Sequence, residues 1–270
     1  MRTSPLRPFP HPLSLKWLFA TLLVCCLSIG CHALAPEPAT IPLTVSAAAS
    51  LQDVLTAIAP AFQTAHPKLR IEFNFAASGT LQQQIAQGAP VDLFFSAAAP
   101  QMDALEQQGL VRPETRRELL TNHLVLITAQ ASPLRIQAWE QLKTTTFEHL
   151  VVGEFRTVPA GQYAQQALKN LALFDAVQPK LVFSRNVRSV LATVEQGNAE
   201  LGLVYATDAA LGDRVRILLP VPTAAHPPIR YPIAVLQASE HPKAAEQWIA
   251  FLQSDMAQMA FRDFGFMPLP

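Results

Sequence analysis

The sequence predicts an α/β fold in two lobes, because segments typical of strands alternate with amphipathic helical segments and because this alternation restarts halfway along the chain. Strands are expected in the first half at 43–45, 69–75 and 91–95, each followed by a helix. From residue 122 the pattern begins again. This rhythm is typical of a parallel sheet with helices on both faces, and two such units indicate two lobes joined by more than one crossing.

The first strand runs directly into a helix. After 43–45 the chain passes through three alanines to Ser50, where apolar residues begin to recur at offsets of three and four. Asp53 stands three residues further on and completes an S-x-x-D capping signature. We therefore expect the first helix to begin at Ser50, with the serine side chain as its cap.

The later elements repeat the order of strand, small polar residues and helix. Ser78 leads into a helix at 81–87 that is closed by Gly88, and Pro232 predicts an irregular or edge position in the last long strand. In the second half, strands are expected at 123–127, 150–153, 180–183, 201–205, 215–219 and 229–236, and helices at 162–171, 188–196, 242–253 and 255–264.

The last two helices follow after the strands and helices of the second unit are complete, which suggests that the chain returns to the first lobe. The predicted division is lobe 1 at 41–121 plus 237–270 and lobe 2 at 122–236, with hinge crossings at 122–128 and 229–236. In such an α/β arrangement a ligand cleft lies between the lobes, at the C-terminal ends of the strands.

The first 35 residues have the character of an export signal. Basic residues precede an apolar run at 17–30 that is short for a membrane span, and no acidic residue occurs before Glu37. Residues 33–35 fit the small-x-small cleavage rule, whereas the box that ends at Cys31 resembles a lipoprotein cleavage site. A soluble exported, periplasmic protein is favoured over one anchored through Cys31.

Composition and motifs exclude several functions. The net charge of zero gives no basic footprint for nucleic acid. All three cysteines lie in the export segment, so the rest of the chain has no thiol chemistry. Nucleophile-elbow, phosphate-loop and dinucleotide motifs are absent, and no two histidines have metal-ligand spacing. We expect neither an enzyme nor a cofactor nor a metal-cation site.

Four strand-to-helix junctions carry small or polar residues: Ser50, Ser78-Gly79-Thr80, Ala160-Gly161 and Asn186-Val187. Each follows a predicted strand and so faces the expected cleft. Helix N-termini offer unpaired N–H groups and positive dipole ends, and no acceptor-rich feature balances them, which favours a small anion. Ordinary helix capping remains the alternative for each serine, threonine and asparagine.

Several stretches, among them A-A-A-S-L at 47–51 and G-A-P-V-D-L-F at 88–94, resemble the periplasmic molybdate-binding proteins of bacterial ABC importers. The resemblance covers about 43–266. It implies a type II periplasmic-binding-protein fold that closes over molybdate or tungstate and delivers it to a membrane permease. A monomer is expected.

The same resemblance implies the ligand contacts. They are the side chains of Ser50 and Ser78, the backbone N–H groups of Ala160 and Val187, and the hydroxyl of Tyr205. Tyr205 does not follow from the junction pattern, because a tyrosine that ends a buried strand is usually a core residue.

Other features leave alternatives open. Ala98 stands where relatives often have an aspartate, which affects a local helix cap and not the site. Arg185 and Arg188 lie near the expected site, and a solvated helix face is favoured for them over a supporting electrostatic role. The ligand could instead be another tetrahedral oxyanion, such as sulfate or phosphate. An exported enzyme on the same fold is disfavoured, because no nucleophile or base pair is visible.

Overall fold

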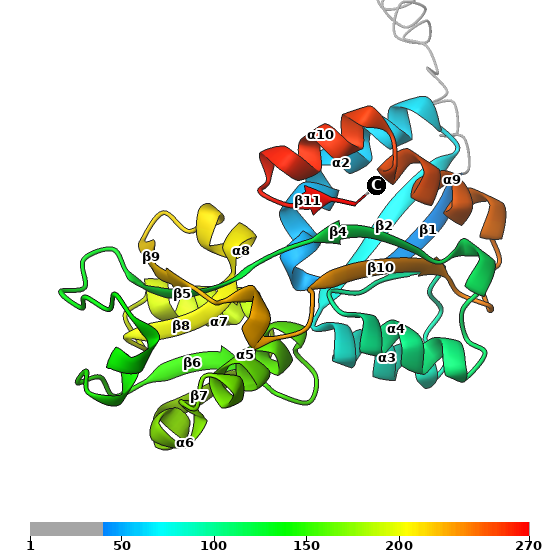
Figure 1. Ribbon diagram of the computed structural model, residues 1–270. Helices are drawn as coiled ribbons and strands as arrows, with labels where there is room; N and C mark the ends of the chain where they lie inside the picture. The colour runs from blue at the N-terminus through cyan, green and yellow to red at the C-terminus, as the bar shows by residue number, and fades with distance from the viewer. Residues whose placement is uncertain (1–39, 270) are drawn as a thin grey trace, which may run out of the picture. The chain divides into compact units, whose positions relative to one another are not determined.

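The computed structural model of the protein describes residues 40–269 (Figure 1). The predicted export segment at 1–35, with both cleavage patterns and Cys31, lies outside this range. Within it, none of the helices combines the length and the apolar character that a bilayer crossing requires.

The first sheet has six strands in the order β11–β4–β10–β3–β1–β2. β1 pairs in parallel with both of its neighbours, and its second half is buried. Figure 1 shows α2, α9 and α10 over one face and α3 and α4 over the other. We call this sheet and these helices lobe 1. Its elements are β1 (Ile41–Ala48), β2 (Leu69–Ala76), β3 (Leu93–Phe95), β4 (Arg117–Thr121), β10 (Arg230–Val235), β11 (Met267–Pro268), α2 (Gln52–Ala65), α3 (Ser78–Ala86), α4 (Ala99–Gln107), α9 (Pro242–Leu252) and α10 (Asp255–Asp263).

The second sheet has five strands in the order β7–β6–β8–β5–β9, and with its helices it forms lobe 2. β6 pairs in parallel with β7 and β8, whereas β5 is antiparallel to β8 and β9. Its elements are β5 (Leu124–Ala129), β6 (Leu150–Gly153), β7 (Leu181–Ser184), β8 (Leu201–Tyr205), β9 (Val215–Pro220), α5 (Pro159–Asn170), α6 (Phe174–Val177), α7 (Val187–Glu195) and α8 (Ala206–Leu211). The predicted two-lobe α/β fold is confirmed.

The chain crosses between the sheets twice. Only Asn122 and His123 separate β4 from β5, and 221–229 connect β9 to β10. β10 pairs with β3 and β4, so the placement of 229–236 in lobe 2 is wrong. The physical reason is that β10 is buried from its second residue to its end, as a central strand of lobe 1 must be. The irregularity expected at Pro232 is confirmed by a register shift beside it.

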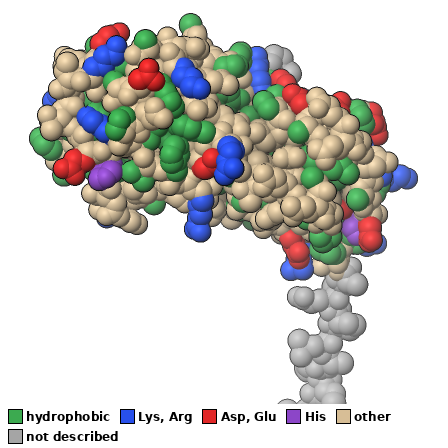
Figure 2. All heavy atoms as spheres, turned by 90° about the horizontal axis from the view of Figure 1, so that it is seen from below, with side chains coloured by type: hydrophobic (Ala, Val, Ile, Leu, Met, Phe, Trp, Pro, Cys, Tyr) green, Lys and Arg blue, Asp and Glu red, His purple; other side chains and the backbone are tan. Residues whose placement is uncertain are grey.

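Charge is distributed evenly over the surface that Figure 2 shows. Basic and acidic side chains are scattered there singly or in small groups of mixed sign. The face therefore carries no basic stripe of the kind that binds a phosphate backbone.

Glycine brings the start of α5 against the end of β6. A Cβ atom on Gly161 would lie 2.0 Å from the carbonyl oxygen of Gly153, and one on Gly153 would lie 2.4 Å from Cγ1 of Val158. Neither position can carry a side chain without moving backbone. This close approach holds the first turn of α5 at the C-terminal end of β6, beside the gap between the lobes.

We expect Gly161→Ala to lower the free energy of unfolding by about 2–3 kcal/mol, because the obstacle is backbone that cannot swing aside. Urea unfolding of the variant measures this. Gln166→Ala on the exposed face of the same helix is the control and should change stability by less than about 0.5 kcal/mol. A Gly161→Ala variant as stable as the parent would contradict the packing argument.

Candidate ligand-binding site

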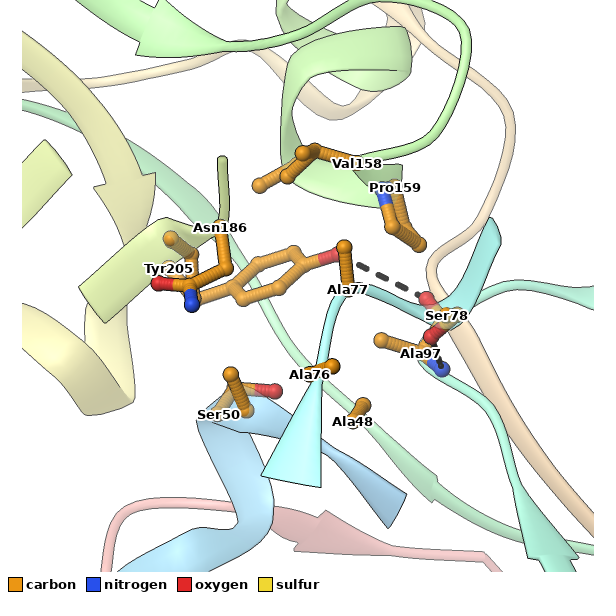
Figure 3. Close-up of a pocket in the computed structure, with 13 residues that line it drawn as sticks. Ala48, Ser50, Ala76, Ala77, Ser78, Ala97, Val158, Pro159, Asn186 and Tyr205 are labelled. Carbon is orange, nitrogen blue, oxygen red and sulfur yellow. Dashed lines mark hydrogen bonds between the residues drawn. The ribbon is translucent and has the colours of Figure 1, made fainter. Parts of the chain in front are cut away.

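A small cavity lies where strand ends and helix starts of both lobes meet (Figure 3). The space open to the centre of a water-sized sphere is about 10 Å³, which limits a guest to a few heavy atoms. Tyr205 is the only titratable residue in its lining. The lining consists of Ala48, Ala49, Ser50, Ala76, Ala77, Ser78, Ala97, Val158, Pro159, Ala160, Asn186, Val187 and Tyr205, which includes all five predicted contact residues.

Helix starts supply the cavity with backbone donors. Ser78 is the first residue of α3, Ala160 the second of α5 and Val187 the first of α7. Ser50 lies in the short 3-10 turn η1 (Ala49–Leu51) that precedes α2. N–H groups in a first turn have no acceptor within their own helix, and they carry the positive end of its dipole. Many of the other lining residues are alanines, whose small side chains leave the backbone accessible.

The backbone N–H and C=O groups of Ala97 connect hydroxyls from the two lobes. Its N–H donates to Ser78 Oγ at 2.9 Å, and the Tyr205 hydroxyl donates to its carbonyl oxygen at 3.5 Å (Figure 3). A backbone N–H can only donate, so Ser78 Oγ is an acceptor here and its own hydrogen is free for a ligand. The Tyr205 bond is at the limit of hydrogen-bond distance, so this hydroxyl is weakly held.

Ser50 does not cap α2, so that expectation is wrong. Ala48 is the residue before η1, and neither η1 nor α2 has a side-chain cap. The 3-10 turn begins before Ser50 and carries it past the capping position. Its Oγ lies instead 3.2 Å from the hydroxyl of Tyr231 in β10. Asn186 does act as a cap, because its side chain accepts the N–H of Ser189 at 2.9 Å.

Arg188 lies between the lobes beside the cavity and not on a solvated helix face, as the sequence had suggested. Its guanidinium contacts Asp53 of lobe 1 at 2.5 Å, the carbonyl oxygen of Ser50 at 3.4 Å, and the fully buried Asp208 of lobe 2 at 2.9 Å. The reason is that α8, which carries Asp208, packs against α7 and places a buried carboxylate under the arginine. This cation therefore has its acidic partners, Asp53 and Asp208, outside the cavity lining.

The lobes also contact each other on the other side of the cavity. The N–H of Gly79 in α3 donates to the carbonyl oxygen of Thr157 at 2.8 Å. A Cβ atom on Gly79 would lie 2.6 Å from Thr157, so only glycine permits this approach. Gln101 and Gln162 add a side-chain hydrogen bond of 3.1 Å between the lobes. Direct contacts between the lobes therefore lie on two sides of the cavity.

Burial controls the ionisation of the groups around the cavity. It raises the pKa of the Tyr205 hydroxyl well above its ordinary value of 10.0, so Tyr205 keeps its hydrogen at physiological pH. Burial also raises the pKa of the Asp208 carboxyl from 3.8 to about 7, and the neighbouring Arg188 offsets only part of this effect.

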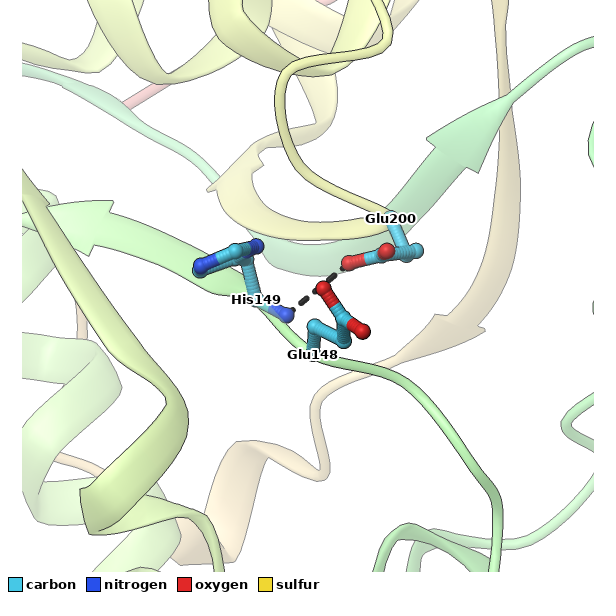
Figure 4. A group of neighbouring side chains, drawn as sticks. All are labelled: Glu148, His149 and Glu200. Carbon is cyan, nitrogen blue, oxygen red and sulfur yellow. Dashed lines mark hydrogen bonds between the residues drawn. The ribbon is translucent and has the colours of Figure 1, made fainter.

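A separate polar group lies in lobe 2 at Glu148, His149 and Glu200 (Figure 4). Their potential ligand atoms lie within 4.8 Å of one another. Glu200 accepts the backbone N–H of His149 at 2.9 Å, which ties together the starts of the parallel strands β6 and β8. This bond explains the cluster, and the absence of a metal-cation site stays a prediction.

Two α/β lobes with a small, donor-lined cavity between them define a substrate-binding protein of the type II periplasmic-binding-protein fold. The sequence model of the family described as "Bacterial extracellular solute-binding protein" matches residues 43–267, and the chain belongs to this family.

Individual relatives agree with this assignment. The chain is 37% identical to the putative ABC transporter substrate-binding lipoprotein YvgL of Bacillus subtilis, covering 84% of this chain and 86% of that protein. It is 36% identical to the molybdate-binding protein ModA of Haemophilus influenzae, covering 84% and 91%. A solved substrate-binding domain of a putative molybdenum ABC transporter from Clostridium difficile is 38% identical, with a TM-score of 0.67 over 86% of this chain and 100% of that one. The predicted family resemblance is confirmed.

We expect the stability contributed by Asp208 to fall as pH rises. Its pKa of about 7 in the folded protein exceeds the ordinary 3.8, so the folded state holds the proton more tightly between these values. Urea unfolding between pH 4.5 and pH 8 should show the stability of the parent declining relative to Asp208→Asn, by at most about 1.4 kcal/mol per pH unit.

Asp175→Asn, which removes an exposed carboxylate of α6, controls for the loss of one charge. A difference between the parent and Asp208→Asn that stays constant across this pH range would show that Asp208 titrates as it does in the unfolded chain.

Proposed function

We propose that the protein binds molybdate or tungstate outside the cytoplasmic membrane and delivers it to the membrane permease of an ABC importer. The observation that carries the proposal is the lining of the cavity, which offers neutral hydrogen-bond donors in a space for a few heavy atoms. The names of relatives that are 34–37% identical, two of them molybdate-binding proteins, support this ligand class.

The donors match the chemistry of a tetrahedral dianion, which has acceptor oxygens and no hydrogen to donate. Hydroxyls of Ser50, Ser78 and Tyr205 and first-turn N–H groups of Ala160 and Val187 act as the ligand contacts. A hydrogen bond to a charged partner contributes about 1.5–3 kcal/mol net, so five such bonds replace much of the lost hydration. Neutral donors also hold an anion less tightly than a buried cation would, which suits a protein that must release its ligand.

Protonated oxyanions fit less well. Monohydrogen phosphate carries a hydrogen that needs an acceptor, and no carboxylate lines the cavity, while Asp53 and Asp208 already face Arg188. Sulfate has no such hydrogen, so it remains the alternative ligand. The protein acts by binding, without catalysis, and the oxyanion is its transported ligand and not a cofactor.

Export and domain motion complete the proposal. Residues 1–35 act as the signal segment, and the mature chain works as a soluble periplasmic monomer, with lipid attachment at Cys31 as the alternative. The lobes hinge at 122–123 and 221–229, the two crossings between the sheets. The permease recognises the closed form.

We expect molybdate and tungstate to raise the free energy of unfolding by about 4 kcal/mol when each is present at 1,000 times its dissociation constant. A thermal-shift series with molybdate, tungstate, sulfate and phosphate at equal concentration measures the order of preference. Stabilisation by sulfate without stabilisation by molybdate would overturn the molybdate assignment and favour the alternative ligand.

Loss of either serine hydroxyl should weaken molybdate binding without unfolding the protein. Ser50→Ala and Ser78→Ala each remove a donor worth about 1.5–3 kcal/mol, so titration calorimetry should show dissociation constants that are about 10-fold to 150-fold higher. Thr80→Val is the control, because it removes a hydroxyl from the same first turn of α3 that does not line this cavity. Unchanged affinity in both serine variants would remove these residues from the site.

A further inference from the structure

A chain of buried side chains leads from lobe 2 to the Ser50 hydroxyl. Asn122 Nδ2 donates to Thr207 Oγ1 at 2.9 Å and to the hydroxyl of Tyr231 at 3.2 Å. The Tyr231 hydroxyl lies 3.2 Å from Ser50 Oγ. Asn122, Tyr231 and Ser50 are 4%, 0% and 2% exposed. Asn122 and Tyr231 do not line the cavity, so neither can touch a ligand there.

The backbone fixes the direction of this chain of hydrogen bonds. The N–H of His123 donates to Asn122 Oδ1 at 2.8 Å, which identifies that atom as the amide oxygen and leaves Nδ2 as the donor. Both hydrogens of Nδ2 are then used, one on Thr207 and one on Tyr231. The Tyr231 oxygen is therefore an acceptor toward Asn122.

The hydrogen of Tyr231 must go elsewhere. Tyr231 is fully buried, and burial raises its pKa above the ordinary 10.0, so the hydroxyl keeps this hydrogen. Among the acceptors of the described residues, Ser50 Oγ lies at hydrogen-bond distance, 3.2 Å, from the Tyr231 hydroxyl, and the Tyr205 hydroxyl is its other polar neighbour. A buried hydroxyl hydrogen without an acceptor lowers the stability of the fold, so Tyr231 donates to Ser50. Ser50 then has its own hydrogen left to donate into the cavity.

We propose that Asn122 and Tyr231 are positioning residues that orient the Ser50 hydroxyl as a donor toward the bound oxyanion. The inference rests on the proposed function and adds two residues that act on the ligand only through Ser50. Asn122 lies at the first crossing and Tyr231 just after the second. The orientation of the donor is therefore set by the two segments that join the lobes.

The test is a double-mutant cycle measured by molybdate titration calorimetry. Tyr231→Phe keeps the ring that packs against Tyr205 and Phe266 but removes the hydroxyl. We expect it to raise the dissociation constant about threefold to tenfold in the parent and to have no further effect in Ser50→Ala. An equal loss of affinity in both backgrounds would show a merely structural role and overturn the proposal.

Thr207→Val is the matched control, because it removes the other acceptor of the same amide without touching Tyr231 or Ser50. It should lower stability and leave molybdate affinity unchanged. A loss of affinity as large as that of Tyr231→Phe would mean that any break in this buried network disturbs the site.

Asn122→Asp provides a second test that does not depend on Tyr231→Phe being stable. A carboxylate at this position accepts from Tyr231, which turns the Ser50 hydrogen toward Tyr231 and a lone pair toward the ligand. Affinity should fall below that of Ser50→Ala, and adding Tyr231→Phe should restore part of it. If the added charge alone lowered the affinity, Tyr231→Phe would not restore it. A double variant with affinity as low as that of Asn122→Asp would therefore contradict the proposal.

If the parent protein binds sulfate and not molybdate, the proposed ligand is wrong. The same cycle with sulfate then tests the positioning role separately.

Discussion

Binding of an anion without a facing cation depends on where each hydroxyl hydrogen points. A serine hydroxyl can present either a hydrogen or a lone pair, and only the hydrogen attracts an oxyanion. Behind Ser78 stands a backbone N–H, that of Ala97, and behind Ser50 stands the hydroxyl of Tyr231. Each of these two groups donates a hydrogen to its serine oxygen, so the hydrogen of the serine is left for the ligand. Tyr231 lies in β10, and Ala97 follows the end of β3 by two residues. These two strands pair with each other in the first sheet, which brings both donors to the same side of lobe 1.

The charges beside the site complement this arrangement by remaining outside the cavity. Arg188 extends from lobe 2 to Asp53 of lobe 1 while Asp208 lies buried beneath it. This ion pair and the contact between Gly79 and Thr157 hold the lobes together on two sides of the cavity. A partly exposed pair contributes modestly to stability, which is consistent with lobes that must separate to release a ligand. Closure therefore depends largely on contacts outside the cavity lining, with Tyr205 contributing both to the lining and to a bond between the lobes.

Sequence reasoning predicted much of the fold and brought together most residues of the candidate site, because local signals mark the elements and their junctions. Helical and period-two spacing located the elements, and the junctions at Ser50, Ser78, Ala160 and Val187 all line the cavity. Tyr205 came from the family resemblance alone.

Apart from the capping role expected of Ser50, the errors concern contacts between distant segments. Ser50 and Tyr231 are 181 positions apart, and Arg188 and Asp53 are 135 apart, so no local pattern predicts either pair. The assignment of β10 to lobe 2 failed for the same reason, because the sequence of a strand does not identify the strands with which it pairs. A crystal structure of the protein with molybdate, phased at the molybdenum edge, tests the central claim most directly. The account predicts one molybdenum peak in the cavity, with Ser50 Oγ, Ser78 Oγ and the Tyr205 hydroxyl about 2.5–3.0 Å from molybdate oxygens. A peak outside the cavity, or an arginine or lysine bound directly to the oxyanion, would contradict it.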